Sequence, residues 1–207
     1  YAGWGRYRQV TDLGVYTKYA DQGYTPACHI WTSSGGTRTH GTVNMMQALA
    51  VSCNYYFYEA GLAVSTEDVD YVAKQLRLGE PTGVELPENT GMRANAETKA
   101  EVYAGSGMEA WVDGDKLQAS IGQSLNAFTP LQMACYTAAL ANQGTRYKAT
   151  FLSRVVSWDY QDLIAESEPE VLSTLEMSDE AIACVSEGMQ MTVGDYSGTA
   201  FSYLNDY

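Results

Sequence analysis

The tripeptide Ser52–Asn54 (Ser-Cys-Asn) places a hydroxyl and an amide two residues apart, between two apolar helical patterns. At the start of a helix, both of these side chains can point into one cleft. The hydroxyl can then relay a proton, and the amide can hydrogen-bond a substrate carbonyl or hold a neighbouring lysine. The same Ser-x-Asn pattern recurs at Ser124–Asn126. The pattern alone therefore does not select a site, because it fits helix capping equally well.

Other catalytic classes have less support in the residues. The chain contains His29 and His40 but no Gly-x-Ser-x-Gly motif, so the usual sign of an esterase-type triad is missing. A triad assembled from scattered residues stays open as an alternative. No phosphate-binding Gly-rich loop occurs, and the many acids include no pair that a glycosidase mechanism would select. We expect no nucleotide and no other cofactor.

The four cysteines are widely spaced and include no Cys-x-x-Cys pair. Cys28 and His29 could offer two metal ligands, but no partner pair lies nearby in the sequence, so we expect no metal site. Cys135 and Cys184 fall within helical patterns and are expected to be small buried side chains. A disulfide between Cys28 and Cys53 is left open by the sequence.

Composition limits the class of protein. The chain has 207 residues, of which 45% are hydrophobic and 18% are charged, and this excludes a charge-dominated disordered chain. No apolar run approaches the roughly 18–20 residues of a membrane span. The net charge of −13 argues against nucleic acid as a partner. Residues 155–207 carry eleven acids and no Lys or Arg, which indicates a solvated acidic face or, as the alternative, a docking surface for a basic partner.

Apolar periodicity predicts a mainly α-helical chain with a minor β component. The first forty residues and residues 79–97 are rich in turn-forming residues and are expected to be loops with short elements. Capping signals accompany the patterns that begin at Ser65, Thr129 and Ser178. The predicted helices cover 43–50, 55–62, 65–76, 130–141 and 178–193, and the predicted strands cover 151–158 and 163–175.

Four ordered segments together resemble the transpeptidase domain of class B penicillin-binding proteins. Residues 40–61 (HGTVNMMQALAVSCNYYFYEAG) contain a His-Gly pair, an amphipathic helix and Ser-Cys-Asn followed by aromatics. Residues 76–91 are similar to the family's Gly-x-x-Thr-Gly loop, residues 111–147 to its Trp, Ile-Gly-Gln and Thr-Pro-Leu-Gln series, and residues 188–200 to the segment before its last motif. The resemblance runs over nearly the whole chain.

The resemblance assigns roles to single residues. It implies that Ser52 relays protons to or from the leaving amine and that Asn54 orients the acyl donor and a lysine. His40 and Gln123 are weaker candidates for substrate binding, and Trp111, like Gln123, would support the cleft wall. Because Ser124–Asn126 falls in the Ile-Gly-Gln segment, that tripeptide is not at the catalytic position.

The sequence also departs from the family pattern. The family uses Ser-x-x-Lys, Ser-x-Asn and Lys/His-Thr/Ser-Gly motifs, and only the second occurs here. Tyr55 stands three residues after Ser52, and Tyr196 precedes Ser-Gly-Thr where a cation would be needed. We therefore expect residues 1–207 to be one partial domain, the helical subdomain of this β-lactamase-like fold with most of its five-stranded sheet missing. Exposed apolar faces would then favour a dimer.

The function implied by the resemblance is that of a peptidoglycan D,D-transpeptidase. Such an enzyme crosslinks stem peptides ending in D-Ala-D-Ala through an acyl-serine, and β-lactams acylate it. The parent protein would be anchored in the bacterial membrane with this domain outside, and the chain alone would be inactive. The alternative is a non-catalytic module that binds peptidoglycan or another carbohydrate, because sixteen tyrosines and four tryptophans could stack on sugars.

Overall fold

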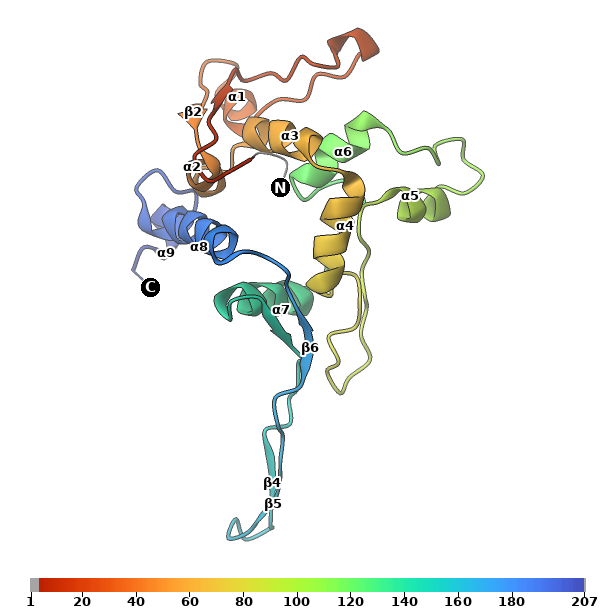
Figure 1. The fold of residues 1–207 in the computed structure, drawn as a ribbon, viewed down its shortest axis with the longest axis vertical. Helices are drawn as coiled ribbons and strands as arrows, with labels where there is room; N and C mark the ends of the chain where they lie inside the picture. The colour runs from red at the N-terminus through yellow and green to blue at the C-terminus, as the bar shows by residue number, and fades with distance from the viewer. Residues whose placement is uncertain (1–3, 207) are drawn as a thin grey trace. The chain divides into compact units, whose positions relative to one another are not determined.

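The computed structural model describes residues 4–206, and these residues form two compact units (Figure 1). Unit 1 contains residues 4–69, 94–125 and 178–206, and unit 2 contains residues 70–93 and 126–177. Helix α4 (Thr66–Gln75) begins in the first segment of unit 1 and continues into unit 2. Each unit is described by itself.

Unit 1 is built mainly from helices. Its elements are β1 (Val10–Asp12), η1 (Ala20–Gln22), α1 (His29–Ser33), β2 (Gly41–Val43), α2 (Met45–Ala50), α3 (Asn54–Ala63), α5 (Ala96–Val102), α6 (Asp113–Ser120), α8 (Asp179–Gly194) and α9 (Phe201–Leu204). Strands β1 and β2 are antiparallel, and Val10 pairs with Val43 while Asp12 pairs with Gly41. This short ladder joins the two ends of the loop-rich N-terminal segment.

Helix α2 is closely packed against helix α8. The N-cap residue Asn44 accepts a hydrogen bond from the Gln47 N–H, and the Gln47 side chain accepts one from the Asn44 N–H, which fixes where α2 begins. Gly188 of α8 faces α2 so closely that an added Cβ would lie 2.6 Å from Cδ1 of Leu49. The end of α2, which leads into Ser52, is thereby held by a second helix.

The core of unit 1 has two clusters that both include side chains of α3. In one cluster Tyr56 packs with buried residues from the preceding segments, which are Cys28, Val43, Ala48 and Cys53. In the other cluster Tyr58 packs with Tyr16 and with Leu117 of α6. The aromatic run that begins α3 is therefore largely core, and this anchors the start of the helix.

Unit 2 contains one long helix, α7 (Pro130–Ala141), whose N-terminus carries the predicted capping box. Thr129 and Gln132 exchange side-chain-to-backbone hydrogen bonds, and Pro130 occupies the first helical position. The buried Gln132 amide also donates to the carbonyls of Glu80 at 2.7 Å and Thr90 at 2.8 Å. These bonds attach the 79–93 loop to the helix.

A long two-stranded ribbon follows α7 in unit 2 (Figure 1). Strand β3 (Thr145–Tyr147) pairs with β6 (Val171–Thr174), and β4 (Arg154–Val156) pairs with β5 (Leu163–Glu166), both antiparallel. The strand predicted over 163–175 is in fact two strands, because the chain leaves the ladder between Glu166 and Val171 around Pro169.

The fold class predicted from the sequence is confirmed. The predicted helices correspond to α2, α3, α4, α7 and α8, and the sheets among the described residues are three separate pairs of short strands. No helix in the described part of the chain is both long and apolar enough to cross a membrane. The expectation that 1–207 forms a single partial domain stays a prediction.

Candidate functional site

Ser52–Asn54 forms the junction between α2 and α3. The Ser52 N–H donates to the Leu49 carbonyl at 3.2 Å, and the Cys53 N–H donates to the Ala48 carbonyl at 2.9 Å. Ser52 itself has φ 55°, a left-handed conformation that is uncommon for a residue with a Cβ. This turn leaves Ser52 exposed, buries Cys53 fully and starts α3 at Asn54.

Asn54 is half-buried at the first position of α3, one turn before Tyr58. Burial raises the pKa of the Tyr58 hydroxyl to about 12, and a hydrogen bond from the Asn54 side chain acts in the opposite direction. The Asn54 side chain therefore lies near a buried tyrosine of its own helix. An exposed hydroxyl and a half-buried amide thus flank the start of α3, and their joint orientation toward one cleft stays a prediction.

Cys53 of this junction belongs to a mostly buried cluster of four potential metal ligands. One ligand atom from each residue lies within 4.8 Å of all the others, and the residues are Asp12, Cys28, His40 and Cys53. Nδ1 of His40 is 3.3 Å from Sγ of Cys28 and 3.0 Å from Oδ2 of Asp12. All four cysteines of the chain are free thiols, so Cys28 and Cys53 face each other without a disulfide.

The four residues meet because each lies at an end of a short element. Asp12 ends β1 and His40 precedes β2, and the pairing of Asp12 with Gly41 brings these two side chains together. Cys28 is the N-cap residue of α1, and Cys53 is the N-cap residue of α3. The cluster thus joins four segments of unit 1 at a single point.

The protonation states of the side chains in this cluster depend on one another. The hydrogen bond from Cys53 is the main cause that lowers the pKa of the Cys28 thiol, and the same contact raises the pKa of Cys53. Burial by itself would lower the pKa of His40, but Cys28 and Asp12 outweigh it and raise that pKa. Asp12 also accepts hydrogen bonds from the backbone N–H groups of Gly14 at 2.8 Å and His40 at 3.0 Å.

This donor set fits a metal ion. Two sulfurs, one imidazole nitrogen and one carboxylate oxygen match the four-coordinate preference of Zn²⁺, and a thiolate is the form that binds it. The backbone N–H groups of Gly14 and His40 donate to the Asp12 carboxylate and orient it, as hydrogen-bond partners of metal ligands usually do. The sequence offered only the adjacent His29 as a partner for Cys28, whereas the structure places the distant His40 beside it. The expectation of no metal site stays a prediction.

The remaining candidates lie outside this cluster. His29 Nε2 is 3.0 Å from the carbonyl oxygen of Val51, so this imidazole contacts the backbone just before Ser52. Gln123 is exposed after α6, and its backbone N–H donates to Gln118. Trp111 is half-buried before α6. Ser124 is exposed, and the one potential ligand cluster in the described part of the chain does not include it.

The family model of the penicillin-binding protein transpeptidase domain matches residues 12–205, so the chain belongs to this family. The relatives place it with the class B members. The predicted resemblance is confirmed.

Individual relatives give the same result. The chain is 35% identical over 116 residues to the peptidoglycan D,D-transpeptidase MrdA of Acinetobacter baumannii, an alignment that covers 56% of the chain and 16% of MrdA. The structure of Pseudomonas aeruginosa PBP2 in complex with WCK 5153 is similar, with a TM-score of 0.76, 21% identity and coverage of 97% of the chain and 42% of PBP2.

A complex between PBP2 and MreC from Helicobacter pylori is also similar in fold, with a TM-score of 0.71 and 23% identity. That alignment covers 95% of the chain and 33% of the H. pylori protein. The chain thus spans less than half the length of these relatives.

Proposed function

We propose that this chain is the part of a peptidoglycan D,D-transpeptidase that carries the Ser-x-Asn motif. Ser52 transfers protons to or from the leaving amine, and Asn54 orients the acyl donor and the lysine of a Ser-x-x-Lys motif. The observation that supports this proposal best is the Ser52–Asn54 junction, where an exposed hydroxyl follows α2 and a half-buried amide starts α3.

The chain by itself should not form an acyl-enzyme. Acyl transfer needs a nucleophile with a base within hydrogen-bond reach, and Ser52 has Tyr55 where the family motif has lysine. Loss of a nucleophile commonly costs several orders of magnitude in rate. We expect no covalent adduct in intact-mass spectra after incubation of residues 1–207 with a labelled penicillin. A stoichiometric adduct on Ser52 would show that this serine is itself a nucleophile.

The role of Asn54 is tested in a protein that contains all three motifs. In that protein, Asn54→Ala should slow acylation by a β-lactam at least about tenfold, because an orienting hydrogen bond is lost. Asn95→Ala, which removes the helix cap of α5 in unit 1, is the control for a general loss of stability. Wild-type acylation by the Asn54→Ala variant would contradict the proposed role.

The proposal also covers the cellular location and the partners of the parent protein. We propose that the parent acts at the extracytoplasmic face of the bacterial membrane on stem peptides, and that protein partners of the MreC type, as in the H. pylori complex, belong to the parent. A dimer of this chain through exposed apolar faces also stays a proposal.

The alternative function, a non-catalytic carbohydrate-binding module, would be supported if peptidoglycan fragments bound to a parent that β-lactams do not acylate.

We also propose that the cluster of Asp12, Cys28, His40 and Cys53 holds one structural Zn²⁺. The supporting observation is the meeting of four buried or half-buried donors from four separate segments. A bound zinc would tie these segments together, and because Cys53 lies between Ser52 and Asn54, it would also fix the catalytic turn.

The zinc proposal predicts one equivalent of metal in protein purified without chelator. Cobalt substitution should give the charge-transfer absorption of a thiolate–Co²⁺ bond, and Cys28→Ser should weaken metal binding by about 10–100-fold or more. Cys135→Ser, outside the cluster, should leave the metal content unchanged. Metal-free protein with a disulfide between Cys28 and Cys53 would contradict the proposal.

A further inference from the structure

The two-stranded ribbon of unit 2 opens between its two ladders and forms a cavity of about 530 Å³. One wall comes from Lys148 and Phe151 and the other from Glu168 and Glu170. Glu85 of the 79–93 loop also lines the cavity, and its carboxylate accepts hydrogen bonds from the Thr150 hydroxyl and, at 3.0 Å, from the Phe151 N–H. These bonds hold the pKa of Glu85 at about 2, so its charge is present at neutral pH.

The cavity and the ribbon are acidic. The cavity is lined by three carboxylates and by one ammonium group, and Nζ of Lys148 lies 3.2 Å from the Glu170 carboxylate. Residues 151–177 contain six acids and a single base, Arg154. A ligand with positive charge is therefore favoured, and phosphate-rich surfaces are disfavoured.

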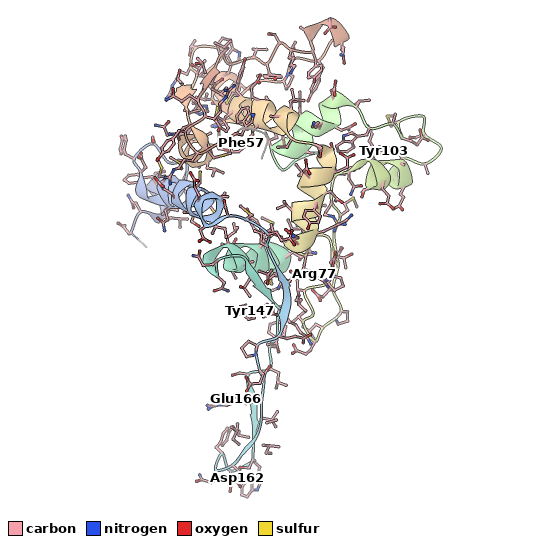
Figure 2. All side chains as sticks on the ribbon, in the orientation of Figure 1. Phe57, Arg77, Tyr103, Tyr147, Asp162 and Glu166 are labelled. Carbon is pink, nitrogen blue, oxygen red and sulfur yellow. The ribbon has the colours of Figure 1, made fainter. Side chains whose placement is uncertain are left out.

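The same ribbon exposes an unusual share of apolar surface. Nine of the 22 large hydrophobic side chains that are exposed in the described part of the chain lie between Tyr147 and Val171. Trp158 is 92% exposed and Tyr160 is 82% exposed at the turn of the hairpin. Figure 2 labels Asp162 near this turn and Glu166 farther along the ribbon. Clustered apolar groups with a polar rim are typical of an interaction surface.

The turn that carries these aromatics is ordered by hydrogen bonds. Oγ of Ser157 donates to the Asp159 carboxylate at 2.5 Å and accepts from the Asp162 N–H at 3.0 Å. The Ser157 N–H donates to the Asp162 carbonyl at 2.8 Å. The exposed aromatics are thus presented by a preorganised turn, which lowers the entropic cost of binding.

The ribbon also has backbone N–H and C=O groups along its edges that can pair with another strand. Strands β4 and β5 pair with each other and with no further strand among the residues that the structure describes, so each strand has one open edge. An open edge can accept an extended segment as an additional strand, with pockets for alternate side chains.

We propose that this ribbon docks an extended, basic segment of a partner protein. The segment would add to the β4–β5 ladder, place its apolar side chains against the exposed aromatics and insert a Lys or Arg side chain into the cavity beside Glu168 and Glu170. The acidic charge argues against an anionic lipid surface or nucleic acid as the occupant. It argues equally against a second copy of this chain, whose ribbon carries the same charge.

The proposal is tested with a synthetic ten-residue peptide in which lysine alternates with valine, titrated onto the whole chain by calorimetry. Glu168→Lys should raise the dissociation constant about tenfold, which corresponds to about 1.4 kcal/mol. Glu101→Lys, an equal charge change on the exposed surface of α5, should raise it less than twofold. A tenfold increase in salt should weaken binding, since the attraction is electrostatic.

Phe151→Ser provides a second variant, because it removes apolar contact at the cavity without changing charge and should also weaken binding. Circular dichroism establishes that each variant is folded. The proposal is overturned if the peptide does not bind at millimolar concentration, if Glu101→Lys weakens binding as much as Glu168→Lys, or if a peptide with glutamate in place of lysine binds equally well. Binding of peptidoglycan glycan fragments in preference to the basic peptide would overturn it as well.

Discussion

Ser52 combines an exposed hydroxyl with a strained backbone. A left-handed conformation costs a residue with a Cβ about 1–2 kcal/mol, and such strain persists where the surrounding structure enforces it. Here Ser52 lies between the C-terminus of α2 and Cys53, which is buried in the core of unit 1. The turn is therefore positioned from both sides, which the role proposed for Ser52 would require.

Substitution of Ser52 should reveal this strain. Ser52→Gly should raise the free energy of unfolding by about 0.5–1 kcal/mol, because glycine adopts the left-handed conformation freely but loses more chain entropy on folding. Ser52→Val should lower it by about 1–2 kcal/mol, because a β-branched residue is poorly accommodated there. Urea denaturation measures both values, and equal stability of the two variants would contradict the argument.

Glu88 stabilises the 79–93 loop through hydrogen bonds to backbone and side-chain groups of that loop. Its carboxylate accepts hydrogen bonds from the N–H of Thr82 at 2.9 Å, the hydroxyl of Thr82 at 2.6 Å and the N–H of Gly83 at 2.9 Å. Burial alone would raise the pKa of Glu88, but these hydrogen bonds outweigh it and lower the pKa. The carboxylate form therefore stabilises the loop.

Glu88→Gln should lower the free energy of unfolding by about 1–2 kcal/mol at pH 7, because an amide cannot replace all of these charge-assisted bonds. Since the folded pKa is depressed, this contribution is complete above the ordinary value of 4.5 and is lost as the pH falls through the lower, folded value. The difference between wild type and variant should thus narrow only below pH 4.5. Glu101→Gln on an exposed helical surface should show no such difference.

At the scale of single residues, the sequence predicted that the Ser-Cys-Asn tripeptide lies between two helices, as it does between α2 and α3, but it did not predict the ligand cluster. Ser52 and Asn54 are adjacent in the chain, and the segments around them carry a recognisable order of motifs. The donors of the cluster are spread from Asp12 to Cys53 and meet only through the β1–β2 register and two helix N-caps. No local spacing reveals such a site, because its geometry comes from tertiary structure.

At the scale of elements, helix capping was the most reliable signal. The capping residues Thr129 and Ser178 each accept the expected backbone hydrogen bond at the start of α7 and α8. The short helices α5 and α6 were not predicted, because their few residues carry no sustained apolar period. Among the strands of the ribbon, β4 and β5 were recognised from their β-branched and apolar residues, whereas β3 was not.

The contact between α2 and α8 depends on one glycine. A Cβ at Gly188 would lie 2.6 Å from Cδ1 and 2.9 Å from Cβ of Leu49, distances that require one helix to move. Gly188→Ala should lower the free energy of unfolding by about 1–2 kcal/mol, because overpacking exceeds the helix propensity that alanine gains. Since α2 leads into Ser52, the same variant in a protein with all three motifs should also slow acylation.

Gly194→Ala is the matched control on the same helix. Apart from its chain neighbours and the nearby backbone of its own helix, no atom lies within 4 Å of the position that its Cβ would take, so this variant should be neutral or more stable by up to about 1 kcal/mol. Thermal denaturation of the two variants in parallel tests the packing argument. It would be wrong if Gly188→Ala were as stable as Gly194→Ala.

At the scale of the whole molecule, a high negative charge coexists with exposed apolar side chains. The net charge is −13, and the exposed large hydrophobic residues include Trp158, Tyr160 and Phe151. At neutral pH, repulsion between copies opposes contact between these surfaces. Charge therefore keeps the chains apart while the apolar surface favours association.

Acidification should shift this balance toward association. The isoelectric point is about 4.4, so lowering the pH from 7 toward that value removes the repulsion and leaves the apolar surface exposed. Static light scattering should show an increase in apparent mass over this range, and added salt at pH 7 should produce a smaller increase by screening. A Trp158→Ser, Tyr160→Ser double variant should associate less at the same pH, while circular dichroism at each pH establishes that the fold persists. An apparent mass that stayed constant from pH 7 to the isoelectric point would show that charge does not keep the exposed apolar surfaces apart.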